Sequence, residues 1–198
     1  MRKLNIFLLC VLVVALLVAG KLYTEPPKEP IKQETQEVQT PPEFVVDPYI
    51  IQLGQEVGIS QETLVKLKAR FVDSCSSMPR TLVCYNGQMT LTNEIKNKDR
   101  YKQRVAITHE YLHYIWHNNQ GMHDSVKPQL LRVYQANKAY FDARFVNYYN
   151  NGMKMGSEEF YNELHSFVGT EVSDSKLPPE LLNHYSKYTN RGALPSYI

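Results

Sequence analysis

Two histidines and a glutamate near the middle of the chain have the types and spacing of a metal centre. The segment His109-Glu110-Tyr111-Leu112-His113 places two imidazoles four residues apart. In an α-helix, positions i and i+4 share one face, so both imidazoles can bind one ion. Glu110 lies about 100° further round such a helix, within reach of a water molecule on that ion. The spacing predicts one zinc ion per chain, because zinc accepts neutral imidazole and activates bound water near neutral pH.

The side chains around this motif are apolar or uncharged, which indicates a buried helix face. On a helical wheel, Val105, Leu112 and Trp116 lie within about 60° of one of the two histidines. Histidines on a buried apolar face need a partner for their ring nitrogens. A metal ion is one such partner, and hydrogen bonds within a protein core are the alternative that the sequence leaves open.

The ten residues from Ala106 to Ile115 resemble the zinc-binding helix of the zincin metallopeptidases. The resemblance implies hydrolysis of peptide bonds, with His109 and His113 as metal ligands and Glu110 as the base that activates zinc-bound water. It also implies a zincin-like α+β fold, mostly helical, with a small hairpin or sheet before the active-site helix. The similarity covers roughly residues 80–170, and only the helix motif is specific.

A third zinc ligand is expected on a later helix. Catalytic zinc usually has three protein ligands and an open position for water, and gluzincin-type zincins take the third ligand from a glutamate. Glu163 lies at the edge of an apolar face that Phe160 and Leu164 help to form, where a carboxylate needs a cationic partner. Glu163 is therefore the predicted third ligand. Glu171 is the alternative, either as that ligand or as the acid that orients a histidine.

Other residues near the motif fit a metal site less well. The segment from Asn162 to Ser166 resembles the gluzincin pattern Asn-Glu-x-x-Ser-Asp only in part, since Phe167 stands where the pattern has Asp. His117 follows one turn after the second histidine, but three ligands on one straight helix cannot easily converge on one ion. Cys84 would match the cysteine ligand of peptide deformylases, which this motif also resembles, only if it were unpaired.

Hydrophobic periodicity predicts several helices before and after the motif. A last short helix is expected to open at Pro178 and Pro179, and Gly169 is expected to end the helix that carries Glu163. The other expected helices cover residues 47–59, 60–73, 99–117, 125–149 and 157–168.

A β-hairpin is predicted just before the motif helix. Residues 81–85 and 88–92 are rich in β-formers and flank the pair Asn86-Gly87, which is typical of a type I′ turn. The strand over 88–92 is placed where zincins have the edge strand that pairs with substrate. Many helices around one small sheet indicate the α+β class.

The composition divides the chain into segments 1–23, 24–43 and 44–198. Residues 24–43 hold five Pro, five Glu and three Gln, a composition that favours a disordered tether. The segment 44–198 is long enough for one domain with its own core. From residue 24 onward, 19 basic residues face 20 acidic ones, because three of the 22 Lys and Arg residues precede it. The segment therefore lacks the excess of basic residues that is typical of nucleic-acid-binding proteins, and nucleic acid is not an expected partner.

The first 23 residues predict export from the cytoplasm. The apolar run Ile6–Ala19 follows Arg2 and Lys3, as in a signal peptide, and with its flanking residues it can also span a bilayer. The basic residues favour the cytoplasmic side, so the rest of the chain is expected outside it. A retained anchor and a cleaved signal both stay open. In an exported domain, Cys75 and Cys84, with eight residues between them, predict a disulfide.

The predicted function is hydrolysis of a peptide or protein substrate by an exported, membrane-tethered zinc metallopeptidase. The alternative is a tethered zincin-like binding protein without turnover. Glu110 favours the enzyme, since a pure binding site does not need an acid between its two ligands. A Tyr or His normally stabilises the oxyanion in such an enzyme, and His184 and Tyr185, which follow the third-ligand helix, are the candidates.

Overall fold

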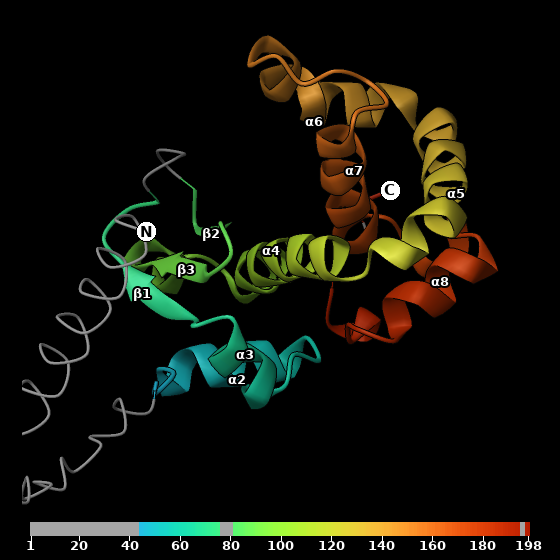
Figure 1. Cartoon of the computed structure of the whole chain (residues 1–198). Helices are drawn as coiled ribbons and strands as arrows, with labels where there is room; N and C mark the ends of the chain where they lie inside the picture. The colour runs from blue at the N-terminus through green and yellow to red at the C-terminus, as the bar shows by residue number, and fades with distance from the viewer. Residues whose placement is uncertain (1–43, 76–80, 195–196) are drawn as a thin grey trace, which may run out of the picture. The chain divides into compact units, whose positions relative to one another are not determined.

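The computed structural model describes residues 44–75, 81–194 and 197–198, and the predicted signal or anchor over 1–23 and tether over 24–43 lie outside these residues. The described residues belong to one unit, Glu43–Ile198. No helix in this part of the chain is long and apolar enough to cross a membrane. The expected class, α+β with mostly helices and one small sheet, is confirmed for this unit (Figure 1).

The helices begin where the sequence supplies caps and prolines. The α-helices of the described chain are α2 (Pro48–Glu56), α3 (Gln61–Lys66), α4 (Arg100–Asn118), α5 (His123–Ala136), α6 (Lys138–Asn150), α7 (Glu158–Glu171) and α8 (Pro179–Ser186). The side chains of Asp47, Ser60, Asp99 and Ser157 each accept a hydrogen bond from a first-turn backbone N–H of α2, α3, α4 and α7. These bonds satisfy donors that a helix start otherwise leaves unpaired. Within the described ranges, four short 3₁₀ helices connect the elements: η1 (Asn93–Asn97), η2 (Gln120–Met122), η3 (Asp174–Lys176) and η4 (Arg191–Ala193).

The sheet has three strands in the order β1-β3-β2, namely β1 (Arg70–Val72), β3 (Met89–Thr92) and β2 (Val83–Tyr85). The predicted hairpin is confirmed, because β2 pairs antiparallel with β3. Its turn differs from type I′. Tyr85 pairs with Met89 across a three-residue loop, and only Gly87 in that loop has a positive φ, 88°. The conformation suits a glycine, which adopts positive φ without a steric penalty.

The assignment of residues 88–92 to an edge strand was wrong. β3 pairs with β1 on one side and with β2 on the other, so its main-chain groups are engaged on both sides. β2 is an edge strand of this sheet and lies nearer the motif, since it packs against α4.

The predicted helix over 60–73 is also shorter than expected. α3 ends at Lys66, and Lys68 has a positive φ of 48°, which turns the chain out of the helix. The next residues, Arg70–Val72, form β1 and pair in parallel with β3. Phe71 and Val72 suit a strand, and pairing with β3 outweighs their helical spacing.

Two further helix boundaries differ from the predictions. The expected helix over 125–149 is two helices, α5 and α6, because Asn137 adopts φ −129° and ψ 32° between them. Conversely, α7 continues through Gly169 to Glu171. A Cβ on Gly169 would lie 2.6 Å from Cε1 of Tyr185 and would also meet Leu112, so this glycine permits a close approach rather than a helix end.

Helix α4 lies between the sheet, α2 and α3 on one side and α5, α7 and α8 on the other (Figure 1), and it contributes to two hydrophobic cores. Its residues Ile107, Tyr111 and Ile115 pack with the sheet, α2 and α3. Leu112 and Trp116, on another face, pack with residues of α5, α6, α7 and α8. A helix packed on two sides into close-packed cores has little freedom to shift. The motif residues on α4 are therefore held in place by both halves of the domain.

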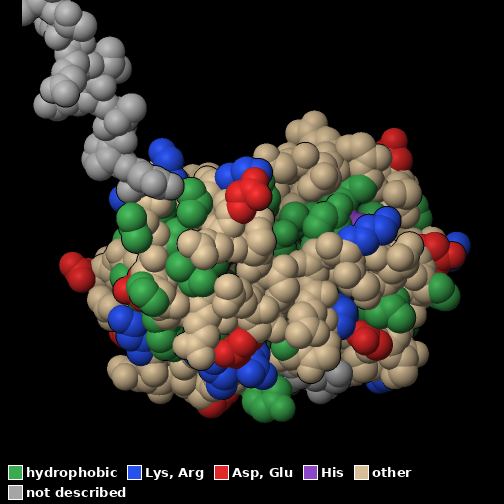
Figure 2. Space-filling view, turned by 90° about the horizontal axis from the view of Figure 1, so that it is seen from below, with side chains coloured by type: hydrophobic (Ala, Val, Ile, Leu, Met, Phe, Trp, Pro, Cys, Tyr) green, Lys and Arg blue, Asp and Glu red, His purple; other side chains and the backbone are tan. Residues whose placement is uncertain are grey.

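The surface carries mixed charge, with acidic and basic side chains interspersed on the face seen in Figure 2. One cluster ties α2 to α4: Glu56 accepts hydrogen bonds from Arg100 and from Arg104, the latter at 2.8 Å. The hydrogen bond from Arg100, together with that from Arg104 and despite partial burial, lowers the pKa of Glu56 to about 2.

Candidate metal centre

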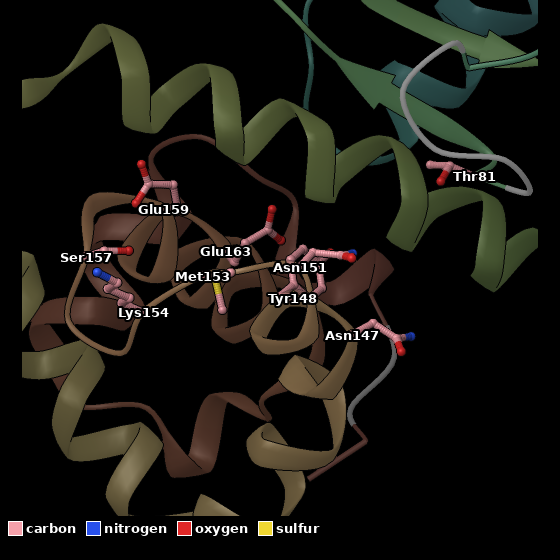
Figure 3. A pocket seen from close by; sticks show the side chains of 10 residues that line it. Thr81, Asn147, Tyr148, Asn151, Met153, Lys154, Ser157, Glu159 and Glu163 are labelled. Atoms are coloured by element: carbon pink, nitrogen blue, oxygen red, sulfur yellow. The ribbon is translucent and has the colours of Figure 1, made fainter.

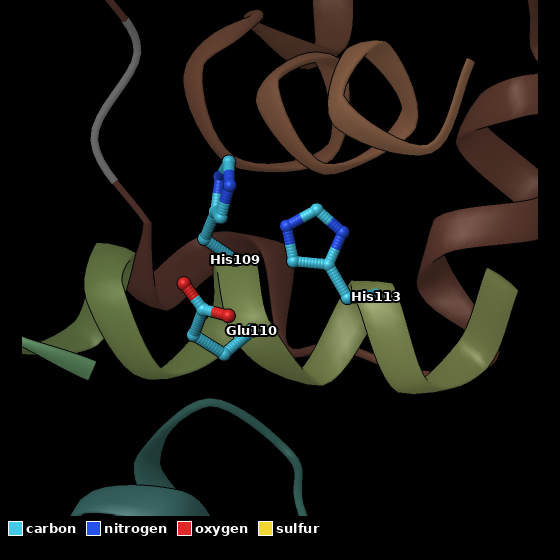
Figure 4. Close-up of side chains that lie close together, drawn as sticks. All are labelled: His109, Glu110 and His113. Carbon is cyan, nitrogen blue, oxygen red and sulfur yellow. The ribbon is translucent and has the colours of Figure 1, made fainter. Parts of the chain in front are cut away.

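The predicted motif lies on α4 and is arranged for one ion. His109, Glu110 and His113 each offer a ligand atom, and these atoms lie within 4.8 Å of one another. Figure 4 shows that both imidazoles project from the same side of the helix, with the Glu110 carboxylate beside them. The side chains of His109 and His113 are only 13% and 9% exposed, so their ring nitrogens face the protein interior. This is the geometry that the i, i+4 spacing predicts.

Glu163 on α7 lies opposite the two histidines. Its Oε2 atom is 3.4 Å from Nε2 of His109, and its Oε1 atom is 3.6 Å from Nε2 of His113. α7 is the helix that packs most extensively against α4, and this packing brings the carboxylate to the motif. Oε2 of Glu163 is buried and has no hydrogen-bond partner among the described residues. A buried carboxylate oxygen without a donor is costly unless a cation compensates it, so this donor set fits a divalent metal.

The protonation states of His109, His113 and Glu163 depend on one another. Burial, reinforced by the charge of His109, lowers the pKa of His113 to about 4, so this imidazole is neutral at physiological pH. Burial also disfavours the charged forms of His109 and Glu163, but their mutual attraction outweighs it, raising the pKa of His109 and lowering that of Glu163. His113 and Glu163 are therefore in the forms that bind zinc, whereas His109 would have to give up the proton that Glu163 favours on it.

Glu110 is almost as enclosed as the histidines. Burial raises its pKa to about 7, the charge of His109 opposes this shift, and the charge of Glu163 adds to it. The backbone of Tyr85, at the end of strand β2, favours the ionised form. Glu110 therefore lies between the candidate metal ligands and the edge strand, where it can exchange a proton with a bound molecule.

The partners of His113 come from α7. Its Nδ1 atom lies 2.9 Å from Oδ1 of Asn162 and 3.2 Å from Oγ of Ser166. A hydrogen bond at Nδ1 fixes the ring and leaves Nε2, which faces Glu163, free to bind an ion. The sequence offered a signal for both residues, since Asn162 and Ser166 flank Glu163 in the partial gluzincin pattern, but their contact with His113 was not predicted.

Phe167 occupies the position where that pattern has Asp. Its ring packs edge to face on His109, with the ring centroids 4.7 Å apart. His109 thus has an aromatic contact where the gluzincin pattern would place a carboxylate.

Glu171 does not orient a histidine, so that alternative was wrong. Its carboxylate accepts hydrogen bonds from the Tyr140 hydroxyl at 2.6 Å, from Nε of Arg144 at 2.9 Å, and from Nη2 of the same arginine. The Glu171 side chain is only 2% exposed, and its charge is balanced by Arg144. No local pattern indicates this ion pair, because the two residues lie on different helices.

The remaining candidates lie outside the cluster. His117 is exposed, and its Nδ1 atom bonds the backbone carbonyl of His113 at 2.8 Å, which agrees with a structural role. The Sγ atoms of Cys75 and Cys84 lie at disulfide distance, 2.17 Å, as predicted, so Cys84 offers no free thiolate. Tyr185 is fully buried and donates to the carbonyl of His165, and His184 pairs with the ring of His165. Neither of the last two candidates reaches the motif.

Two cavities meet at the motif. Thr81 and Tyr148 line both of them. The first, about 380 Å³, is also lined by His109 and Glu110. The second, about 920 Å³, is also lined by Glu163, and Figure 3 shows its other side chains on α6, on α7 and on the loop between them, with Thr81 on a separate segment beside α4. His109 and Glu163 therefore line different cavities, whose walls share Thr81 and Tyr148.

Tyr148 is a functional candidate that the sequence did not single out among the 14 tyrosines. Burial, followed by the charge of the nearby Glu163, raises the pKa of its hydroxyl well above the usual value of 10. The hydroxyl therefore stays protonated at physiological pH and can only donate a hydrogen bond to a negative atom.

Three comparisons with known proteins identified no relative of this chain. A scan against protein-family models, a search of curated proteins and a search of solved structures each gave no match.

Proposed function

We propose that the chain is a zinc-dependent peptidase whose metal is held by His109, His113 and Glu163. The proposal includes a zincin-like arrangement, in which a small sheet precedes the helix that carries the two histidines. The observation that carries it is the position of Glu163. A buried carboxylate oxygen without a donor faces two imidazoles that come from another helix. Zinc bound there would polarise a substrate carbonyl and make a neighbouring water acidic.

Glu110 is the proposed general base. Its carboxylate would accept one proton from the water that attacks the scissile carbonyl. It would then pass this proton to the amine nitrogen as the C–N bond breaks, so that an acid and an amine leave. Its place on the helix supports this role, because it is adjacent to the ligand atoms and lines the 380 Å³ cavity.

Tyr148 is the proposed donor to the developing oxyanion. Its hydroxyl is protonated, lies near Glu163 and borders both cavities. A donor aimed at the oxygen that gains charge stabilises the transition state more than the ground state. We expect Tyr148→Phe to lower kcat by on the order of 100-fold while leaving the zinc content unchanged.

Strand β2 is the proposed docking edge for the substrate backbone. The N–H of Thr92 bonds the carbonyl of Leu82, so the alternation of an antiparallel pair turns the main-chain groups of Val83 and Tyr85 away from β3. Leu82 and Val83 line the same cavity as His109 and Glu110. An extended peptide added along this edge would pass over the metal centre.

The proposed location is outside the cytoplasm, tethered to the membrane or secreted. It rests on the apolar run Ile6–Ala19 after two basic residues, and the disulfide between Cys75 and Cys84 agrees with an oxidising compartment.

The test uses the full-length chain, loaded with zinc and freed of excess metal. We expect about one zinc per chain by mass spectrometry, and cleavage of an unbiased peptide library that a chelator abolishes. Glu110→Gln should keep the zinc and lower cleavage by on the order of 100-fold or more, the usual contribution of a positioned base. The matched control is Glu180→Gln, an exposed glutamate on α8, which should leave both quantities unchanged.

Two results would reject the proposal. A chain that stays metal-free after loading has no zinc site, and an active Glu110→Gln variant has another base. A chain that binds zinc and peptide but cleaves nothing would instead be the tethered binding protein that the sequence left open.

A further inference from the structure

One arginine beside the metal centre is not explained by the proposed hydrolysis. Arg144 on α6 lines the 380 Å³ cavity together with His109, Glu110 and Tyr148. Its side chain is 43% exposed, whereas its partner Glu171 is 2% exposed. An ion pair is seldom needed for stability alone, because well-packed apolar side chains often serve as well. We therefore looked for a role of Arg144 and Glu171 in the cavity that both residues line.

The guanidinium of Arg144 is held in a fixed orientation. Nε and Nη2 both donate to the carboxylate of Glu171, which also accepts a hydrogen bond from Tyr140. The guanidinium carbon lies over the rings of Phe167, at 5.4 Å from its centroid, and Tyr140, at 5.8 Å. Nη1 has no hydrogen-bond partner in the part of the chain that the structure describes. One donor edge of a positioned guanidinium is thus left for a ligand, and planar anions such as carboxylates match that edge.

Phe167 links this edge to the metal centre. The Phe167 ring centroid lies 5.4 Å from the guanidinium carbon of Arg144 and 4.7 Å from the ring centroid of His109. The guanidinium is therefore within about 10 Å of the His109 ring. An extended peptide advances about 3.3 Å per residue. A group bound at Arg144 would therefore lie within about three residues of a bond cleaved at the metal.

We infer that Arg144 receives a carboxylate of the substrate, within three residues of the scissile bond. This inference rests on the proposed function for the position of that bond. The carboxylate can be an Asp or Glu side chain or the C-terminus of a peptide. Glu171 and Tyr140 are positioning residues, which act by holding the guanidinium.

The experiment measures peptide capture by the full-length Glu110→Gln variant, loaded with zinc and immobilised, so that binding is separated from cleavage. The probe is an equimolar set of alanine-based peptides. Each carries Asp, Asn, Glu or Gln at one varied position and ends in a free or an amidated C-terminus. We expect carboxylate peptides to be enriched about tenfold over their amide counterparts, the factor that corresponds to one charge-assisted contact.

The variant Arg144→Gln should abolish the enrichment, and Arg144→Lys should restore only part of it. Because Arg144→Gln leaves Glu171 buried without its cation, the double variant Arg144→Gln/Glu171→Gln removes both charges and guards against simple unfolding. Arg132→Gln, at an exposed arginine on α5, is the matched control and should keep the full enrichment.

Enrichment confined to free C-termini assigns the carboxylate to the end of the peptide, and enrichment of Asp and Glu peptides assigns it to a side chain. Equal capture of acids and amides, or no capture of either, overturns the inference, as does enrichment that survives in the double variant. Enrichment without any cleavage by the chain with Glu110 intact rejects the peptidase and leaves carboxylate recognition standing. Cleavage without a carboxylate preference rejects carboxylate recognition by Arg144 and leaves the peptidase standing.

Discussion

Helix α7 carries two largely enclosed glutamates, Glu163 near its middle and Glu171 at its end, that have different surroundings. Glu171, near the C-terminal end, accepts hydrogen bonds from Arg144 and Tyr140. Glu163, two turns earlier, faces His109 and His113, and one of its oxygens has no hydrogen-bond partner among the described residues. Glu163 lines the 920 Å³ cavity and Glu171 lines the 380 Å³ cavity.

This contrast separates a carboxylate that the protein satisfies by itself from one that it does not. An arginine supplies a permanent positive charge, so Glu171 needs nothing further. The histidines that face Glu163 supply less: His113 is neutral, and the proton that Glu163 favours on His109 is one that a zinc ion would displace. The comparison therefore predicts that metal binding depends on Glu163 and that folding stability depends on Glu171.

The largest effect is expected for Glu163→Ala. Removal of a direct ligand should weaken zinc binding by on the order of 100-fold or more, because residues that merely orient a ligand already contribute ten- to 100-fold. Zinc at about 1,000 times its Kd should stabilise the unaltered chain by about 4 kcal/mol, and a variant with about 100-fold weaker binding should lose about 2.7 kcal/mol of this gain at the same zinc concentration. Calorimetric titration and thermal unfolding with and without zinc measure the two quantities. Zinc affinity equal to that of the unaltered chain would show that Glu163 is not a ligand.

The next effect is expected for Glu171→Ala, and it should appear in stability. The change leaves Arg144 and Tyr140 without their acceptor, so we expect a loss of about 2–4 kcal/mol in the free energy of unfolding. Zinc affinity should stay within about threefold of the unaltered value. Urea unfolding followed by circular dichroism measures the loss of stability. Glu180→Ala, at an exposed glutamate, is the control. A variant that loses its zinc but not its stability would reverse the roles of the two glutamates.

A smaller effect is expected from Gly169→Ala, between the two glutamates. The new methyl group would collide with Leu112 of α4 and with Tyr185, so the helices must separate or the side chains must move. Overpacking of this kind costs about 1–3 kcal/mol. Zinc affinity should fall as well, because α4 and α7 carry different ligands. Gly121→Ala, where no atom lies within 4 Å, is the control. Unchanged unfolding and zinc titration curves would mean that the contact between α4 and α7 is not tight.

Local patterns allowed α4 and its cluster to be predicted from the sequence. The spacing of His109 and His113 and the cap at Asp99 depend on nearby residues only, and α4 begins and ends within a residue of its prediction. Glu163 could be singled out because an acid at the edge of an apolar helix face is unusual.

Features that depend on distant contacts were missed. β1 has three residues, too few to show an alternating pattern, and its partner β3 lies some twenty residues later. Gly169 has the residue type of a helix end, and only its contacts with Leu112 and Tyr185 explain why α7 continues. The pairing of Glu171 with Arg144 likewise depends on how α6 meets α7, which no local pattern reports.

Glu56 extends the comparison to a third carboxylate, one that is paired with Arg100 and Arg104 far from the cavities. Its pKa is about 2 in the folded chain, below the ordinary value of 4.5, so the folded state binds this proton more weakly than the unfolded state. The stabilisation is therefore complete above about pH 5 and is lost as the pH falls toward 2. With allowance for solvent screening of a partly exposed group, we expect about 1–2 kcal/mol.

The measurement is the difference in unfolding free energy between the unaltered chain and Glu56→Gln, in chelator, from pH 2 to pH 7. Distant titrating groups cancel in this difference because their contributions are additive. The gap should be widest near neutral pH and should narrow toward pH 2, where Glu56 is protonated in the unfolded state and about half protonated in the folded state. A gap that stays constant over this range would mean that hydrogen bonding, which glutamine partly retains, outweighs charge at this site. In that case the contrast between Glu163 and Glu171 would also have to be sought in hydrogen-bond donors rather than in compensating cations.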